Sequence, residues 1–362
     1  SPLGHLAAVQ EALARPHSNL RKASNQALID ALQALAQDYP RDADLLRQRY
    51  VDALPAHVLA RKANVAEVTI HKWQKQAIKR LAEILWAGET QAQQRRRARL
   101  LERLEPATYT RLFGVDQHIR RLSQVLQTPG PPHLIALEGL GGIGKTALAD
   151  ALLRHAIGAG LVQDFAWVSA RQQVLDSGGA LKPLGRPAMT ADRLIEALAD
   201  QLLPDDARPA SAPAAQLLAS LQGRLQRGAH LLVVDNLETV VDVESLLPAL
   251  RRLAGPAKFL LTTRQGLQAE PDVFHFSLPE LSLADSLALV RFEAGLRNLE
   301  HVLAAGDDDL RPIYATVGGN PLALKLVTGQ LYLLPLALVL ENLRAARDKS
   351  TEELYRYIYW TA

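Results

Sequence analysis

The sequence predicts a multi-domain protein that joins helical domains to an α/β domain built on a parallel sheet. Residues 5–50 and 55–86 repeat leucine, alanine and valine at helical spacing, without strand-like alternation. After about residue 108, short apolar runs alternate with helical segments, and from about residue 272 the helical spacing returns. A run of four to six residues that is apolar on both faces is typical of a buried parallel strand. We expect such strands at residues 133–137, 165–168, 230–234 and 258–261.

The changes in pattern along the chain suggest the domain boundaries. The predicted segments are a helical helix-turn-helix domain (1–88), a basic linker helix (89–107), the α/β domain (108–271), a second helical domain (272–348) and the start of a further domain (349–362). Two stretches rich in proline, alanine and glycine, 176–188 and 204–214, are typical of long surface loops. A chain of 362 residues is long enough for two or three separate cores.

Composition excludes several classes of protein. The sequence contains no cysteine, which rules out a disulfide framework and a thiolate zinc site. No apolar stretch approaches ~18 residues and no signal peptide is visible, so we expect a cytoplasmic protein that makes no use of a membrane. The net charge of +3 is too small to indicate a nucleic-acid partner by itself. Residues 57–105, however, hold eleven lysines and arginines against five glutamates.

A glycine-rich motif follows the first predicted strand. Residues 139–146 read Gly-Leu-Gly-Gly-Ile-Gly-Lys-Thr, and a helical pattern continues from residue 146 to 153. In this strand–loop–helix order, backbone N–H groups and the helix N-terminus can surround a phosphate. Lys145 is expected to reach the β- and γ-phosphates, and the Thr146 hydroxyl to bind Mg²⁺. The predicted phosphate contacts are Gly139, Gly141, Gly142, Ile143, Gly144, Lys145, Thr146 and Ala147.

Two further polar residues follow predicted strands. Asp235 ends the apolar run at 230–234 and is the expected second Mg²⁺ ligand with Thr146. Arg264 follows the run at 258–261, where its guanidinium can contact a γ-phosphate. Lys145, Asp235 and Arg264 are therefore the predicted catalytic residues.

The residue after Asp235 bears on turnover. Asn236 stands where many ATPases have an acidic residue that orients the attacking water, and an amide cannot accept a proton. Hydrolysis is therefore expected to be slow. Glu238 lies close in sequence and is an alternative acid.

Six motifs in this order resemble the NB-ARC family of STAND-class signal-transduction ATPases, found in plant resistance proteins, apoptosome proteins and bacterial regulators. They lie at residues 112–116, 139–146, 165–169, 231–235, 262–264 and 318–324, within a resembling region of about 108–345. The resemblance implies an ADP- or ATP-binding domain with Mg²⁺. It implies that Phe113, Gly114 and Val115 line an adenine pocket, and that Pro321 packs on the base or sugar. The family's winged-helix domain would begin at about residue 350.

The N-terminal third has the spacing of a helix-turn-helix. Leu59-Ala60, Asn64-Val65 and Thr69-Ile70 occupy the positions of the first helix, the turn and the second helix. Residues 44–81 are similar to region 4 of bacterial sigma factors, and the combination indicates a bacterial protein. The predicted contacts to double-stranded DNA are His71, Lys72, Lys75 and Lys79. The alternative is a protein-docking module. The residues expected in its core are Trp73, Ile78, Leu81 and Leu85.

The leading hypothesis is a nucleotide-operated switch. ADP would hold a closed monomer, and exchange for ATP would open it for self-association. Its output would pass through the helix-turn-helix, as transcription control or as effector recruitment in defence. Two alternatives stay open, namely a DNA-dependent ATPase of the AAA+ kind and an adaptor whose helix-turn-helix binds protein.

Overall fold

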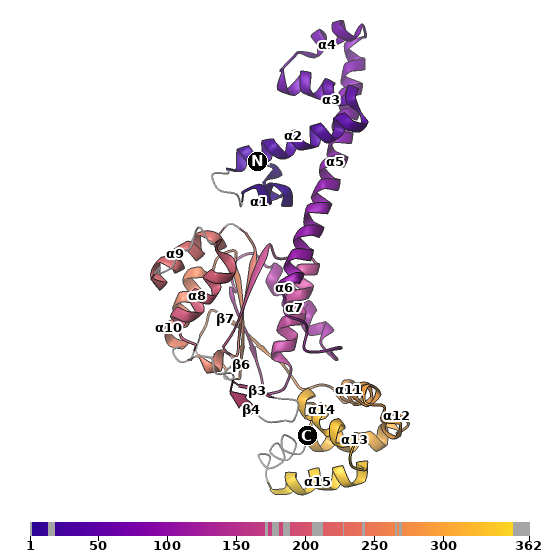
Figure 1. Cartoon of the computed structure of the whole chain (residues 1–362), viewed down its shortest axis with the longest axis vertical. Helices are drawn as coiled ribbons and strands as arrows, with labels where there is room; N and C mark the ends of the chain where they lie inside the picture. The colour runs from indigo at the N-terminus through magenta and orange to yellow at the C-terminus, as the bar shows by residue number, and fades with distance from the viewer. Residues whose placement is uncertain are drawn as a thin grey trace. The chain divides into compact units, whose positions relative to one another are not determined.

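A computed structural model describes most of the chain, which divides into two compact units, Ser1–Arg103 and Leu104–Ala362 (Figure 1). The described residues are 2–13, 19–170, 173–175, 181–183, 189–204, 213–226, 228–240, 243–264, 266–267 and 270–349. The two loops expected at 176–188 and 204–214 lie largely outside these residues, as does the domain start expected at 349–362.

The first unit is entirely helical in its described part. Its elements are a 3-10 turn Pro2–His5, α1 Ala7–Leu13, α2 Leu20–Asp38, α3 Pro40–Leu46, a π-helical turn Arg47–Val51, α4 Ala56–Ala63 and α5 Glu67–Glu102. Leu35, Leu46 and Ala77 form one small core where α2 and α3 pack on α5. Leu59, Ala60 and Ile70 form another, where α4 packs on α5. Both cores are apolar, as the helical spacing predicts.

The turn between α4 and α5 has the geometry that the sequence suggests. Asn64 ends α4 in the left-handed conformation, with φ 53° and ψ 45°, and α5 begins three residues later. Asparagine tolerates this backbone region better than other non-glycine residues. The small side chain of Ala60 lies buried between the two helices.

Helix α5 differs from the expectation in two ways. It runs without interruption from Glu67 to Glu102, through the boundary expected at residue 88. The buried carboxylate of Glu89, one residue past that boundary, accepts a hydrogen bond of 2.6 Å from the Ala7 backbone, so α1 contacts α5 there. Trp73 and Ile78 are 41% and 43% exposed, so the expectation that they are core residues is wrong. The apolar face of α5 is used by Ile70 and Ala77 instead.

The second unit contains a five-stranded parallel sheet in the order β2–β5–β6–β1–β7. The strands are β1 Leu134–Glu138, β2 Asp164–Ser169, β5 His230–Asp235, β6 Lys258–Thr263 and β7 Val273–Ser277. A separate antiparallel pair consists of β3 Gln173–Leu175 and β4 Leu181–Pro183, the latter inside a stretch expected to be loop. β1, β5 and β6 are buried along their whole length, as their apolar runs predict.

Strand β7 corrects the expectation that the chain is helical from about residue 272. Val273–Ser277 pairs in parallel with β1 at the edge of the sheet, so the sheet extends past the boundary expected at residue 271. Two of its five residues are buried and the others are at least partly exposed, because an edge strand is covered less completely. It therefore lacks the continuous apolar run by which the other strands were found.

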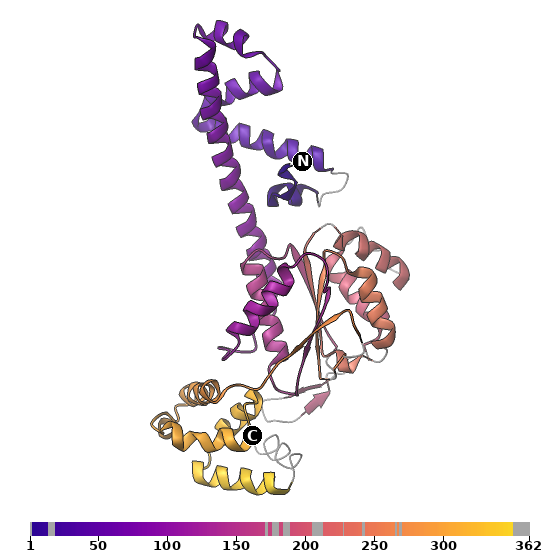
Figure 2. The same cartoon turned by 180° about the vertical axis from the view of Figure 1, so that it is seen from behind.

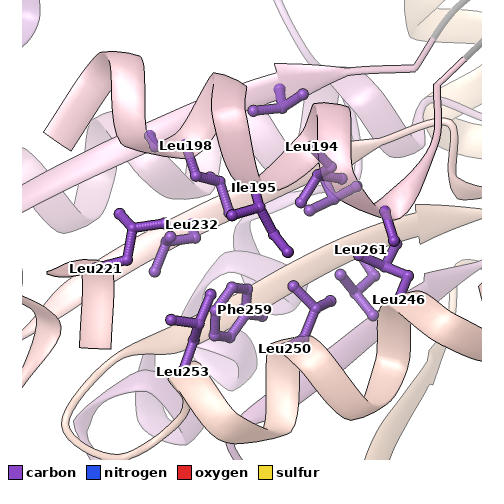
Figure 3. Close-up of a cluster of buried hydrophobic side chains, with 14 of the residues drawn as sticks. Leu194, Ile195, Leu198, Leu221, Leu232, Leu246, Leu250, Leu253, Phe259 and Leu261 are labelled. Atoms are coloured by element: carbon purple, nitrogen blue, oxygen red, sulfur yellow. The ribbon is translucent and has the colours of Figure 1, made fainter. Parts of the chain in front are cut away.

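Helices cover both faces of the sheet (Figures 1 and 2). α6 Asp116–Gln127 and α7 Lys145–Gly158 lie on one face, and α8 Ala191–Leu202, α9 Ala214–Leu225 and α10 Val243–Leu253 on the other. Figure 3 shows leucines of α8, α9 and α10 packed on Leu232, Phe259 and Leu261 of β5 and β6. This core fixes the strands whose carboxyl ends carry the polar residues discussed below.

The helices at the C-terminal end form their own core at one end of the sheet (Figures 1 and 2). They are α11 Leu283–Leu296, α12 Glu300–Leu303, α13 Asp307–Val317, α14 Pro321–Gln330 and α15 Leu336–Lys349. Val290, Ile313 and Leu324 are fully buried within this core. The expected fold class is therefore confirmed, with helices, a parallel α/β domain and further helices in that order.

Candidate functional site

The glycine-rich loop connects β1 to α7 in a conformation that L-residues rarely adopt. Gly142 has φ +76° and Gly144, which precedes the first residue of α7, has φ +102°. A Cβ on Gly142 would also lie 2.8 Å from the Leu322 Cβ, so both backbone angle and space require glycine there. The other predicted loop residues follow in order, with buried Ile143 in the loop and Thr146 and Ala147 in the first turn of α7.

Lys145 is folded back on the loop that precedes it. Its ammonium group donates to the carbonyl oxygens of Gly139, at 2.8 Å, and Leu140, at 2.9 Å. Burial lowers the pKa of Lys145, and Arg264 lowers it further, while Glu238 and Asp235 act in the opposite direction. An anion beside this ammonium group would stabilise its charged form, so the site favours a phosphate ligand.

Asp235 accepts hydrogen bonds from hydroxyl groups on three other elements. Its Oδ1 accepts hydrogen bonds of 2.7 Å from the hydroxyls of Thr146 and Thr262, and its Oδ2 accepts one of 3.3 Å from Ser169. Asp235 is 1% exposed. The structure thus brings together Thr146 and Asp235, the two predicted metal ligands, although they are 89 residues apart in the sequence.

The donor set fits Mg²⁺ in combination with a nucleotide. A hydroxyl and a carboxylate are oxygen ligands, and Mg²⁺ in phosphate sites takes only one or two protein ligands, with phosphates and waters completing the shell. No group of three or more His, Cys, Asp or Glu side chains in the described parts of the chain is arranged to hold a metal ion.

Arg264 lies beside the loop and is paired with Glu238. Its Nε is 3.1 Å from Glu238 Oε1, and its backbone N–H donates to Oε2 at 3.3 Å. The guanidinium carbon lies 3.4 Å from where a Cβ on Gly141 would be. Glu238 belongs to the short helix η4 Leu237–Thr239, which follows Asn236 in the left-handed conformation. Sequence spacing alone gave no indication of this pair.

The motif at 318–324 reaches the loop directly. Asn320 is fully buried and its Nδ2 donates to the Gly141 carbonyl at 2.9 Å. The Leu322 backbone N–H lies 3.3 Å from the Gly142 carbonyl oxygen. Pro321 is the first residue of α14, where its missing N–H costs nothing. Sequence reasoning singled out Pro321 and missed Asn320, although asparagine before a helical proline is a known capping signal.

The motif at 113–115 packs against the C-terminal helices. The Phe113 ring lies 5.6 Å from that of Phe292 in α11, and the Arg111 guanidinium covers it at 4.9 Å. Gly114 has φ +66°, and a Cβ there would lie 3.3 Å from Leu281. Val115 precedes α6. Leu281 in turn donates its backbone N–H to the Gly319 carbonyl at 2.9 Å, so two predicted base-side motifs meet at this residue.

The predicted nucleic-acid residues belong to the first unit and share the exposed surface of α5. His71, Lys72, Lys75 and Lys79 are all exposed. Within the helix, His71 lies 3.7 Å from Glu67, and Lys79 lies 4.0 Å from Glu83. Such exposed pairs contribute little to stability, so these side chains stay available to a partner.

No helix in the described portion of the chain combines the length and apolarity that a membrane span requires.

The parallel sheet, the glycine loop after β1 and the carboxylate at the end of β5 together define a P-loop nucleotide-binding domain. Residues 115–271 match the model of the NB-ARC domain family. This segment of the chain is an NB-ARC domain, which implies adenine-nucleotide binding.

Curated relatives are plant proteins. The chain is 27% identical over 230 residues to "Probable disease resistance RPP8-like protein 4" of Arabidopsis thaliana, covering 61% of this chain and 23% of that protein. It is 26% identical over 255 residues to "Disease susceptibility protein LOV1" of the same plant, covering 67% and 26%. The chain thus spans about a quarter of the length of these relatives. The family match begins at residue 115, so the sigma-factor-like domain and the bacterial origin stay predictions.

Solved structures give weaker likenesses. Drosophila ORC bound to DNA is 17% identical with a TM-score of 0.45, covering 68% of this chain and 65% of that one. A STAND protein with a tetratricopeptide repeat sensor from Pyrococcus horikoshii is 17% identical with a TM-score of 0.40, covering 67% and 34%. Scores of this size add nothing to the family assignment.

Proposed function

We propose that residues 108–348 act as a nucleotide-operated switch of the STAND class, which binds ADP or ATP with Mg²⁺. The observation that carries the proposal is the direct contact between the loop and the C-terminal helices, through the Gly142 carbonyl and the Leu322 N–H. A ligand held where two separately packed regions meet couples its own phosphate state to their arrangement.

Each polar residue of the site has a role in this proposal. Lys145 exchanges its two loop carbonyls for phosphate oxygens, which are anionic and stronger acceptors. Thr146 and Asp235 hold Mg²⁺, which neutralises phosphate charge when it is bound. Arg264 senses the γ-phosphate beside the loop.

Slow turnover follows from the groups near Asp235. Asn236 supplies no proton acceptor, and its backbone N–H donates to the Thr262 hydroxyl at 2.9 Å. Glu238, the alternative acid, is paired with Arg264. We therefore expect the domain to keep its nucleotide bound and to hydrolyse ATP only slowly.

The test is to identify the nucleotide bound to the purified protein and to titrate the protein with ADP and with ATP. The wild-type chain should carry ADP and hydrolyse ATP well below ~1 per second, the lower end of the range typical of enzymes. Lys145→Ala should reduce ADP affinity at least about 100-fold, because the variant has no ammonium group to pair with the phosphates. Lys22→Ala, at an exposed lysine of α2, is the control and should change nothing. Rapid DNA-stimulated hydrolysis would contradict the switch and favour the AAA+-like alternative.

Self-association is the proposed consequence of exchanging bound ADP for ATP. The ADP form should be monomeric, and the form loaded with a slowly hydrolysed ATP analogue should be larger. Light scattering after size-exclusion chromatography measures both masses. Equal masses in the two states would remove oligomerisation from the proposal.

The proposed output is the first unit, acting as a helix-turn-helix. The left-handed Asn64 between α4 and α5 and the exposed basic residues of α5 support binding to double-stranded DNA. Replacing Lys72, Lys75 and Lys79 together by alanine should weaken binding. It should also reduce the salt slope by about one for each lysine that pairs with a DNA phosphate. Lys22→Ala is again the control.

Absence of salt-dependent DNA binding would favour the alternative output, an adaptor that recruits a protein effector. The two relatives are named as a disease resistance protein and a disease susceptibility protein, which supports defence signalling as the setting of that alternative.

A further inference from the structure

A single buried side chain connects the phosphate loop to the helical region. The amide of Asn320 is fully buried, and its two ends bind different elements. Its Oδ1 accepts from the backbone N–H groups of Leu322 and Ala323, at 3.1 and 3.3 Å, and thereby caps α14. Its Nδ2 donates to the Gly141 carbonyl at 2.9 Å, across 179 residues of sequence. An amide side chain can do both because it carries a donor and an acceptor on one planar group.

The surrounding backbone leaves this side chain little freedom. A Cβ on Gly319 would lie 2.2 Å from the Leu281 carbonyl oxygen, so the two backbones are in close contact. The Gly319 N–H donates to the Glu280 carboxylate at 2.9 Å. On the other side, the Leu322 side chain occupies the space where a Cβ on Gly142 would be. The residues before α14 are thus held between the β7–α11 connection and the loop.

The hydrogen bond to Gly141 fixes the orientation of a peptide group in the loop. In a trans peptide, the C=O of one residue and the N–H of the next point in opposite directions. Because Asn320 holds the Gly141 carbonyl on the α14 side, the Gly142 N–H is turned to the other side. A P-loop binds phosphate through N–H groups presented in this manner.

We propose that Asn320 is a positioning residue that sets the Gly141–Gly142 peptide and transmits occupancy of the loop to α14. The inference rests on the proposed nucleotide switch and deepens it, because it names the side chain through which the switch acts. Phosphate bound to the loop N–H groups polarises the same peptide, strengthens its carbonyl as an acceptor and so tightens the bond to Asn320.

Two substitutions of Asn320 remove its hydrogen bond to Gly141 but keep its cap on α14. Asn320→Ser and Asn320→Asp both keep an oxygen that can cap α14. The serine side chain is too short to reach Gly141 as well, and the carboxylate cannot donate and faces a carbonyl oxygen. Asp309→Ala is the matched control. It removes the acceptor for the Gly306 N–H, at 3.0 Å, and thus a side-chain cap on α13 of the same helical region.

Two measurements on the full chain test the proposal. A fluorescent ADP analogue gives affinity, and hydrogen exchange of the first turn of α14, with and without ADP, gives the coupling. Both Asn320 variants should lose about tenfold in affinity, the equivalent of one buried hydrogen bond. They should also lose the ADP-dependent slowing of exchange at Leu322 and Ala323. Asp309→Ala should keep both, with a lowered melting temperature.

Each contrary result has a definite meaning. Unchanged affinity and unchanged ADP-dependent protection in the Asn320 variants would overturn the positioning role and leave the switch intact. The same holds if Asp309→Ala loses affinity as much as they do, since the effect would then be general destabilisation. Failure of the wild-type chain to bind ADP would overturn the proposed function, and this inference with it.

Discussion

At the scale of single residues, Lys145 illustrates how burial prepares a cation for a ligand. The lowered pKa of this side chain comes first from burial, and the phosphate loop offers it only neutral carbonyl partners. Charged lysine is the form that binds phosphate. Its charge is lost as pH rises through the pKa, so a lowered pKa moves that loss toward neutral pH.

We therefore expect ADP affinity to fall as pH rises, beginning below the ~10.4 at which an ordinary lysine titrates. Lys145→Arg should bind more weakly at neutral pH but show no such fall, since arginine stays charged. Calorimetric titration at several pH values, from neutral to strongly alkaline, measures both. A flat profile in the wild-type chain would contradict a role for the Lys145 charge.

The Arg264–Glu238 pair leads to a second prediction. If Arg264 senses the γ-phosphate, Arg264→Ala should lower ATP affinity about tenfold and leave ADP affinity within about twofold. Glu238→Gln frees the guanidinium and should shift the preference toward ATP. Competition of unlabelled ADP or ATP against labelled ADP provides the ratio of the two affinities. Equal losses for ADP and ATP in Arg264→Ala would assign it a structural role at the loop instead.

The site residues divide according to how they were found. Lys145, Thr146 and Asp235 were predicted because each lies at a fixed offset from a strand or glycine motif. Asn320 and the pairing of Glu238 with Arg264 were not predicted. Their partners are set by packing between elements distant in the sequence, and no local pattern encodes that.

At the scale of elements, helix α5 shows how tertiary contacts extend local structure. The domain boundary was expected at residue 88, a glycine, which has a high entropic cost in a helix. The helix continues through it, and α1 contacts the next residue, Glu89. β7 is an edge strand that is only partly buried, so it lacks the continuous apolar run that predicts a buried strand.

Substitution at Gly88 tests the continuous helix. A Cβ there meets nothing within 4 Å, so Gly88→Ala should stabilise the N-terminal unit by about 0.5–1 kcal/mol. Gly88→Pro should destabilise it by about 3 kcal/mol. Thermal unfolding followed by circular dichroism compares the three chains. A proline variant as stable as the wild type would place a real break at residue 88.

At the scale of the whole molecule, the two compact units should unfold separately. ADP at about 100 times its dissociation constant should stabilise only the unit that begins at Leu104, by about 2.7 kcal/mol. Scanning calorimetry with and without ADP should resolve one shifted and one unshifted transition. Lys145→Ala, with its affinity reduced about 100-fold, should keep at most about 0.4 kcal/mol of this stabilisation. A single transition that moves as a whole would show that the units are thermodynamically coupled.

The sequence by itself determined the class of fold, the phosphate loop and the carboxylate at the end of β5. These depend on periodicity and short motifs, which are local properties of the chain. Only the tertiary structure decided that α5 is continuous, that β7 completes the sheet and that Asn320 joins α14 to the loop. Each of those depends on contacts between residues far apart in sequence, where burial and packing outweigh local preference.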